Sequence, residues 1–231
     1  HTEGSRNVAI GHQAGYQTAG TGAGSNDDIF IGYQAGGGDW ASAESNKNVA
    51  IGSYSMDAVM NAAQSNTAVG YNSLSSLTSG DGNTAVGSTA LTACQTGADN
   101  VVVGYQAGED LTGSNCTFIG AGAGMQSTAG NNTAVGHDAG GSMTTWDSNT
   151  AIGKQALQGQ SGQAMNYCTA IGASALASGS ITTGANGTTA VGHSALTALT
   201  SGAQNTVVGY EAGAEFTTGG YNTAIGYQAM H

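Results

Sequence analysis

NTAVGHDAG, residues 132–140, is one of thirteen copies of a nine-residue frame that recurs along the chain. The frames begin at residues 7, 28, 48, 66, 83, 100, 116, 132, 149, 168, 188, 205 and 222. Successive frames start 16 to 21 residues apart, and a repeat of this length is typical of a solenoid. The sequence therefore predicts a single repetitive solenoid over residues 1–231, whose repeats extend from Asn7 to Met230.

The quoted stretch also holds residue types that general-base catalysis uses, because His137 precedes Asp138 and Ser142 follows five residues after the histidine. The same position after the glycine is tyrosine, histidine, lysine, serine or alanine in the other frames. A catalytic base would not occupy a position that tolerates so many residue types. We therefore interpret His137 as a repeat residue, and we expect no catalytic residues and no enzymatic activity.

Two pairs of adjacent carboxylates, Asp27–Asp28 and Glu109–Asp110, raise a second catalytic possibility. Glycoside hydrolases use paired carboxylates, so a glycan hydrolase on the flank of a solenoid is one reading of these pairs. The members of each pair are neighbours in sequence, and we place them in the connectors between frames. We therefore expect both pairs to be solvated.

The composition excludes several kinds of partner. The chain has 3 Lys and Arg against 14 Asp and Glu, with a net charge of −11. Nucleic acids and anionic membranes are bound by clustered Lys and Arg, so neither is expected as a partner. No apolar run of about 18 residues predicts membrane insertion, and no signal peptide is visible. Because the repeats reach both ends without atypical caps, we expect the chain to be a segment of a longer fibre.

The frame itself predicts a short strand followed by a turn. Positions two to four are small, β-branched or apolar, which favours a strand, and alternation places position three on the opposite face from positions two and four. Position three is Ala in nine frames. An inward alanine leaves room only for a thin roll, in which we expect two short strands of each coil to lie close together. The glycine at position five predicts a tight turn with positive φ.

Position one is Asn in nine frames and Asp28, Cys116, Cys168 or Thr188 in the others. Asparagines stacked in register can hydrogen-bond along the axis of a solenoid. We favour such an Asn ladder over a row of metal or ligand-binding residues, because Cys and Thr substitute into it. We expect the three cysteines, which include Cys94, to be buried and free, and we expect no metal site and no cofactor.

Position four is Val or Ile in every frame. A stripe of this size would expose an apolar patch at the upper end of what soluble monomers show. Its constant side-chain size is what a symmetric contact between identical chains requires. We therefore expect an interface between copies of the chain at what we call the Val/Ile column: Ile10, Ile31, Ile51, Val69, Val86, Val103, Ile119, Val135, Ile152, Ile171, Val191, Val208 and Ile225.

Position six is tyrosine in five frames and histidine in three. An exposed row of such rings could stack on sugar faces, and the alternative is a ladder that only stabilises the surface of the coils. The candidate residues for contact with a receptor or glycan, which we call the aromatic row, are Tyr33, Tyr71, Tyr105, His137, His193, Tyr210 and Tyr227.

The frames NVAIGHQA, NVAIGSYS and NTAVGYNS resemble the head repeats of trimeric autotransporter adhesins. They are also similar to the repeat arrays of phage tail fibres and of surface proteins that end in a self-cleaving endosialidase-type chaperone. The resemblance implies an all-β fold, a left-handed parallel β-roll or β-solenoid of about thirteen coils that assembles as a homotrimeric fibre for attachment. The coils here are longer than those of adhesin heads, so the connectors must bulge outwards. No chaperone or membrane anchor is visible at the C-terminus, which leaves phage and bacterial origins open.

These patterns predict a structural and adhesive protein, a segment of a phage tail fibre that takes part in host attachment. The expected partners are two further copies of the chain and a glycan or protein receptor on the host surface. A bacterial surface adhesin head is the alternative, so the expected location is the virion or the extracellular surface of a cell. Two further classes remain, an ice-binding solenoid, because position two is Thr in nine frames, and a glycan hydrolase.

Overall fold

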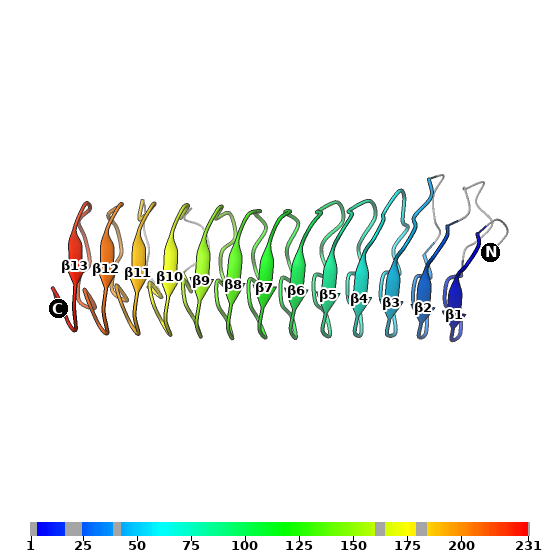
Figure 1. The fold of residues 1–231 in the computed structure, drawn as a ribbon, viewed down its shortest axis with the longest axis horizontal. Coiled ribbons are helices and arrows are strands. Elements are labelled where there is room, and N and C mark those ends of the chain that lie inside the picture. Colours follow the sequence, from blue (N-terminus) through cyan, green and yellow to red (C-terminus); the bar gives the residue numbers. More distant parts are fainter. Residues whose placement is uncertain (1–3, 17–24, 39–42, 160–164, 179–183, 231) are drawn as a thin grey trace. The chain divides into compact units, whose positions relative to one another are not determined.

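The computed structural model describes residues 4–16, 25–38, 43–159, 165–178 and 184–230. These residues form an all-β parallel β-solenoid without helices, in which every frame contributes one strand of three residues (Figure 1). The strands are β1 (Val8–Ile10), β2 (Ile29–Ile31), β3 (Val49–Ile51), β4 (Thr67–Val69), β5 (Thr84–Val86), β6 (Val101–Val103), β7 (Thr117–Ile119), β8 (Thr133–Val135), β9 (Thr150–Ile152), β10 (Thr169–Ile171), β11 (Thr189–Val191), β12 (Thr206–Val208) and β13 (Thr223–Ile225).

The chain divides into two compact units, residues 1–115 and residues 116–231. Within the first unit, each strand from β1 to β6 pairs in parallel with the next strand along the chain, and β7 to β13 pair in the same way within the second. The pairing joins equal positions of the frame, for example Thr67 with Thr84 and Val69 with Val86. Because coils of different length keep this register, the connectors absorb all of the length variation.

The predicted alternation of the strands is confirmed. From β2 to β13 the middle residue of every strand is buried, and Ala50, Ala68 and Ala85 have no exposed surface. The flanking residues of the strands are exposed or half-buried. The interior is therefore lined by position three, and positions two and four face outwards.

A larger residue at position three is accommodated by a smaller residue at position nine, on the other side of the coil. Phe30 and Phe118 are fully buried, and each packs against a glycine at position nine of its own frame. A Cβ on Gly36 or on Gly124 would lie 2.4 Å from the phenylalanine ring. In frames with Ala at position three, a buried Leu or Met at position nine, such as Leu74, usually fills the same space. Positions three and nine therefore share one volume, and side chains this close-packed must compensate in size.

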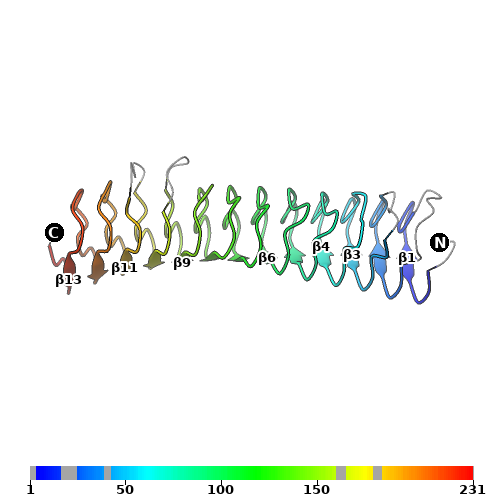
Figure 2. The same cartoon turned by 90° about the horizontal axis from the view of Figure 1, so that it is seen from above.

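The expectation of two strands in each coil is wrong, because the described part of every coil contains a single strand. After the strand, the residues at positions seven and nine adopt left-handed backbone conformations, as Asn72 does with φ 55° and Leu74 with φ 53°. A residue in this conformation cannot continue an extended strand. The far side of the coil is therefore closed by turns, and Figure 2 shows the strands of each unit along one side of its coils.

The glycine at position five is required for two reasons. Its φ lies between 126° and 147° in all thirteen frames, a range that other residues rarely adopt. Its α-carbon also lies close to the backbone of the next coil, because a Cβ on Gly70 would be 2.3 Å from the carbonyl oxygen of Gly87. The predicted turn with positive φ is thus confirmed, and successive glycines pack against one another within each unit.

The Asn ladder is confirmed as a buried spine of hydrogen bonds. The side-chain Nδ2 of Asn66 donates to the carbonyl of Gly80 at 2.9 Å and closes its own coil. Its Oδ1 accepts from the backbone N–H of Asn83 at 2.9 Å and from the Asn83 amide at 3.1 Å. Asn83 repeats this arrangement with Gly97 and Asn100. Each asparagine thereby satisfies a connector carbonyl and binds the next coil.

The cysteines have the environment that the sequence predicts, since all three are buried and none forms a disulfide bond. Cys168 occupies position one, and its Sγ lies 3.2 Å from the carbonyl of Ala185, where an asparagine would place its Nδ2. Burial raises the pKa of Cys168 and of Cys94 to about 11. These thiols therefore stay protonated at neutral pH and act as small buried side chains.

Candidate interaction surfaces

We define the outer sheet face of each unit as positions two and four of its frames. None of its residues carries a charge. No residue of the Val/Ile column is buried, and the exposed fraction is 41% at Ile119, 59% at Ile10 and 71% at Ile225. A continuous row of exposed β-branched side chains without charges is suited to an apolar partner rather than to solvent.

The outer sheet face differs between the two units at position two. In the first unit this position is occupied mainly by Val and Ile, with Thr only in β4 and β5. In the second unit all seven strands carry threonine here, and their hydroxyl groups form an unbroken row in register: Thr117, Thr133, Thr150, Thr169, Thr189, Thr206 and Thr223. The second unit thus presents alternating rows of hydroxyl-bearing and purely apolar side chains.

The aromatic row forms a separate surface in which neighbouring rings contact one another. In the first unit, His12 stacks on Tyr33 with ring centroids 5.5 Å apart and planes inclined by 9°. Tyr54 makes edge-to-face contacts with Tyr33 and Tyr71, with centroid distances of 5.3 and 5.9 Å. These four rings therefore form one exposed cluster across four consecutive coils.

The second unit contains a similar stack. His193 lies on Tyr210 with centroids 5.2 Å apart, and Tyr210 lies on Tyr227 with centroids 5.6 Å apart, both pairs nearly parallel. A hydrogen bond with Glu211 raises the pKa of Tyr210. Because the ring faces are turned towards one another, the stack offers edges and hydroxyl groups to a ligand more readily than faces.

Of the seven residues of the predicted aromatic row, Tyr33 and Tyr71 lie in the first cluster, whose other members His12 and Tyr54 are outside the predicted row. His193, Tyr210 and Tyr227 form the second cluster. Tyr105 and His137 make no ring contact among the described residues. Tyr54 belongs to the first cluster but was missed in the sequence, because it stands at position seven, in a coil that has Ser53 at position six. The left-handed backbone conformation of position seven places the Tyr54 ring beside the position-six rings of Tyr33 and Tyr71 in the neighbouring coils. The sequence of the frame does not indicate this conformation.

His137 and Asp138 are close but form an exposed pair. The Nδ1 of His137 lies 3.0 Å from Oδ2 of Asp138, with 60% and 33% of the two side chains exposed. No hydrogen bond links Ser142 to His137 in the part of the chain that the structure describes. An exposed pair of this kind contributes little to stability.

Replacing His137 by alanine, or Asp138 by serine, should therefore change the free energy of unfolding by no more than about 1 kcal/mol. Alanine already occupies the equivalent of His137 at Ala121, and serine occupies the equivalent of Asp138 at Ser174. Chemical denaturation of the two variants and the wild type would measure the difference. Loss of any activity found in the wild-type chain through either substitution would restore the catalytic interpretation.

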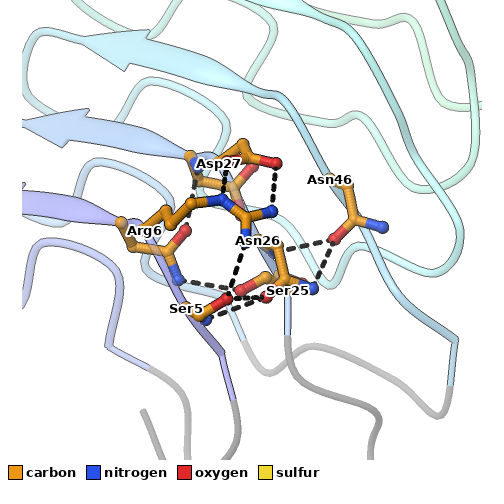
Figure 3. Close-up of polar contacts among 8 residues, drawn as sticks. Ser5, Arg6, Ser25, Asn26, Asp27 and Asn46 are labelled. Atoms are coloured by element: carbon orange, nitrogen blue, oxygen red, sulfur yellow. Dashed lines mark hydrogen bonds and ion pairs between the residues drawn. The ribbon is translucent and has the colours of Figure 1, made fainter.

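A polar cluster lies where the chain enters the first strands (Figure 3). Arg6 binds both carboxylate oxygens of Asp27, and this hydrogen bonding holds the pKa of Asp27 below its usual value. Beside this pair, Oδ1 of Asn26 accepts from the backbone N–H of Ser5, and Oδ1 of Asn46 accepts from that of Asn26. In this second ladder the backbone N–H of the earlier coil donates to the side chain of the later coil, whereas in the Asn ladder the later coil donates to the earlier one. The second ladder fixes the residues before position one.

The expectation that both carboxylates of the Asp27–Asp28 pair are solvated is wrong for Asp28. Asp27 is exposed, but Asp28 has no exposed surface and occupies position one of its frame. Its Oδ1 accepts from the backbone N–H of Asn48 at 2.8 Å, and its own N–H donates to Oδ1 of Asn7 at 2.9 Å. Burial raises its pKa to about 7. The register of the frame places this carboxyl group in the Asn ladder despite its charge.

The second pair of carboxylates lies nearer the surface. Asp110 is exposed, and Glu109 is half-buried and accepts a hydrogen bond from Nε2 of Gln106. Across the described residues, no three His, Cys, Asp or Glu side chains are grouped to hold a metal ion. The same residues include no helix long and apolar enough to cross a membrane.

The outer sheet face and the two aromatic clusters are therefore the surfaces on which function must be argued. Comparison with protein-family models, with curated protein sequences and with solved structures gave no match to this chain.

Proposed function

We propose that this chain is a structural and adhesive fibre segment whose copies associate through the outer sheet face. The observation that carries the proposal is the Val/Ile column, an uncharged row of half-exposed β-branched residues on a solenoid with a thin interior. The interior of one chain is filled by alanines together with larger side chains such as Leu74 and Trp146, and no residue of the Val/Ile column contributes to it. Association of several chains would bury the column as well.

The energetic gain from such association is substantial when summed along the fibre. Burying a half-exposed Val or Ile contributes about 1 kcal/mol. The same contribution recurs at every strand, because the register keeps the column continuous within each unit. A constant side-chain size fits an arrangement in which equivalent residues meet around a symmetry axis. A homotrimer, the state that the resemblance to adhesin heads and tail fibres implies, satisfies these requirements.

Replacing both Val86 and Val103 by aspartate is expected to dissociate this oligomer. The two residues lie at position four of β5 and β6, and each charge would be repeated in every copy around the axis. Light scattering and native mass measurement should show a trimer for the wild type and monomers or unfolded chains for the double variant.

The control for this experiment adds the same number of charges at position six, through Ser53→Asp and Ser88→Asp. These residues lie outside the Val/Ile column, and their position carries lysine or histidine in other frames. The control should remain trimeric. A well-folded and stable wild-type monomer would refute the proposed assembly.

The proposed role of the fibre is attachment, in a phage tail fibre or, alternatively, in a bacterial surface adhesin head. The surface that supports a receptor contact is the aromatic row together with the amides and carboxylates beside it. Tyr210 is hydrogen-bonded to Glu211, and Gln34 donates a hydrogen bond to Gln13. A glycan or protein on the host surface is the proposed partner. Binding of the labelled chain to host cells, and its loss in a Tyr210→Ala and Tyr227→Ala double variant, would test this role.

The threonine row of the second unit favours a second candidate, an ice-binding surface. Seven consecutive strands present a threonine at position two beside the apolar column, and regular hydroxyl and methyl groups can order water. The two functions compete for the same face, because a trimer interface would cover the row. Thermal hysteresis well above that of a control protein, from a chain that remains monomeric, would favour the second candidate over the fibre.

A further inference from the structure

Asp28 stands in a position where the ladder uses an amide group. In its neighbours on either side, the Nδ2 atom of position one donates to a connector carbonyl, from Asn7 to Ser25 at 2.8 Å and from Asn48 to Ala63 at 2.9 Å. The acceptor is in each case the residue three places before the next frame. For Asp28 the corresponding residue is Ser45.

The register around Ser45 shows that its carbonyl lies in the same row as those two acceptors. The backbone N–H of Ser45 donates to Oγ of Ser25 at 3.2 Å, and Oγ of Ser45 accepts from the N–H of Ala63 at 3.1 Å. Ser25, Ser45 and Ala63 are therefore equivalent residues of three consecutive coils. The middle carbonyl faces position one of its own coil, as the outer two do.

The carboxyl group of Asp28 reproduces only half of the asparagine arrangement when it is ionised. Its Oδ1 accepts from Asn48, as the Oδ1 of an asparagine does. Its Oδ2 takes the place of Nδ2 but is buried without a hydrogen-bond partner. An ionised carboxylate cannot donate a hydrogen bond, so a lone pair of Oδ2 would face the carbonyl oxygen of Ser45 and the two oxygens would repel each other. A proton on Oδ2 would convert this atom into the missing donor.

We propose that Asp28 is a proton-binding site of the Asn ladder, in which the protonated carboxyl group donates from Oδ2 to the carbonyl of Ser45 and thereby closes the second coil. Release of that proton to solvent leaves a buried charge facing a carbonyl oxygen. The second coil and its contacts with the adjacent coils are then less stable against local opening.

The electrostatic surroundings agree with this assignment. Burial raises the pKa of Asp28 from 3.8 to about 7, and the donors from Asn48 oppose the rise without cancelling it. The neighbouring charge is Asp27, which also raises the pKa of Asp28, while Arg6 binds Asp27 and Lys47 acts on it. The elements packed against Asp28 on either side contribute the uncharged Asn7 and Asn48. No cation described in the structure binds Asp28.

The sign of the pH dependence follows from the raised pKa. Below about pH 4 the group is protonated in the folded and the unfolded chain, and the stabilising proton is fully present. As the pH rises from about 4 to about 7, the unfolded chain releases the proton and the folded chain retains it, so stability falls. Above the folded pKa the contribution is lost and the curve becomes flat.

The experiment uses the full 231-residue chain and its Asp28→Asn variant, with Asp27→Asn as a matched control that removes the adjacent exposed carboxylate. Hydrogen exchange of the amides of Asp28 to Ile31, corrected for intrinsic rates, reports opening of the second coil. In the wild type the protection factors should fall by up to about a thousand-fold between pH 4 and pH 8. In Asp28→Asn they should be flat, because the amide donates at every pH. Asp27→Asn should retain the wild-type dependence.

A direct titration complements the exchange measurement. The carboxyl carbon resonance of Asp28, assigned through the side-chain protons of Asp28 in the wild type, should titrate near pH 7 in the folded chain. A midpoint below pH 5, or pH profiles of protection that run parallel in the wild type and Asp28→Asn, would overturn the proposal. The direct titration needs only the folded wild type, so it remains decisive even if a variant folds poorly.

Discussion

Replacing Gly87 by alanine should strongly destabilise the first unit. Gly87 has φ 143°, and a Cβ there would lie 2.2 Å from the carbonyl oxygen of Gly104. Strain of this backbone conformation and a clash with backbone atoms act together, and the expected loss in free energy of unfolding is about 3 kcal/mol or more. Circular dichroism during chemical denaturation would measure the loss.

A matched substitution shows whether the position or the methyl group matters. Gly141 has no left-handed conformation, and a Cβ there would have its nearest neighbour, the carbonyl oxygen of Asp138, at 3.4 Å. Gly141→Ala should therefore change the free energy of unfolding by less than about 1 kcal/mol. If both variants lost stability equally, the close packing of glycines between coils would not be the cause.

Replacing Asn83 by alanine should have the second large effect. Its amide donates to Gly97 at 2.8 Å, and its Oδ1 accepts from the backbone and the side chain of Asn100 at 3.1 and 2.9 Å. All these groups are buried, and alanine leaves the carbonyl of Gly97 and the N–H of Asn100 without this partner. Unsatisfied buried groups cost about 1–3 kcal/mol each, so we expect a loss of about 3–5 kcal/mol in the free energy of unfolding.

Asn83→Cys provides a graded comparison, because the chain itself uses cysteine at this position of the frame. A thiol can donate weakly to the Gly97 carbonyl, as Cys168 does towards Ala185, but it offers little to the N–H of Asn100. Its stability should lie between those of the wild type and Asn83→Ala. Equal stability of all three chains would mean that the ladder hydrogen bonds contribute nothing net.

Much of this fold could be predicted from the frame, because the residues that one coil requires recur in thirteen copies of it. The strand, the inward position three and the turn at the glycine follow from alternation and from backbone sterics. The Asn ladder follows from the recurrence of one amide in register, and Cys116 and Cys168 showed that this position is structural. The strand and the turn depend on residues within nine positions of each other, and the ladder depends on one residue that recurs from frame to frame.

Other features could not be predicted because they depend on how the coil closes. Neither Gln106 nor Leu74 is a residue type that favours a left-handed backbone, so the sequence predicts a second strand where turns occur. The joint size constraint between Phe30 and Gly36 becomes visible only when positions three and nine share one volume. The contact of Tyr54 with Tyr33 depends on that same turn.

Asp28 shows a different kind of failure. Its position in the frame favours burial, whereas its charge and its neighbour Asp27 favour solvation. The hydrogen bonds of adjacent coils fix the register on both sides of Asp28 and leave it no other place. Where a local preference conflicts with a repeat that is enforced from both sides, the repeat prevails at an energetic cost.

The tolerance of the connectors makes this solenoid a display scaffold. Strands pair position by position whether the frames start 16 residues apart, as at Cys116 and Asn132, or 20 apart, as at Cys168 and Thr188. Insertions of several residues between frames therefore need no compensating change in the strands, the glycines or the ladder. Recombination between such repeats can therefore lengthen, shorten or exchange connectors while the strands, the glycines and the ladder keep their register.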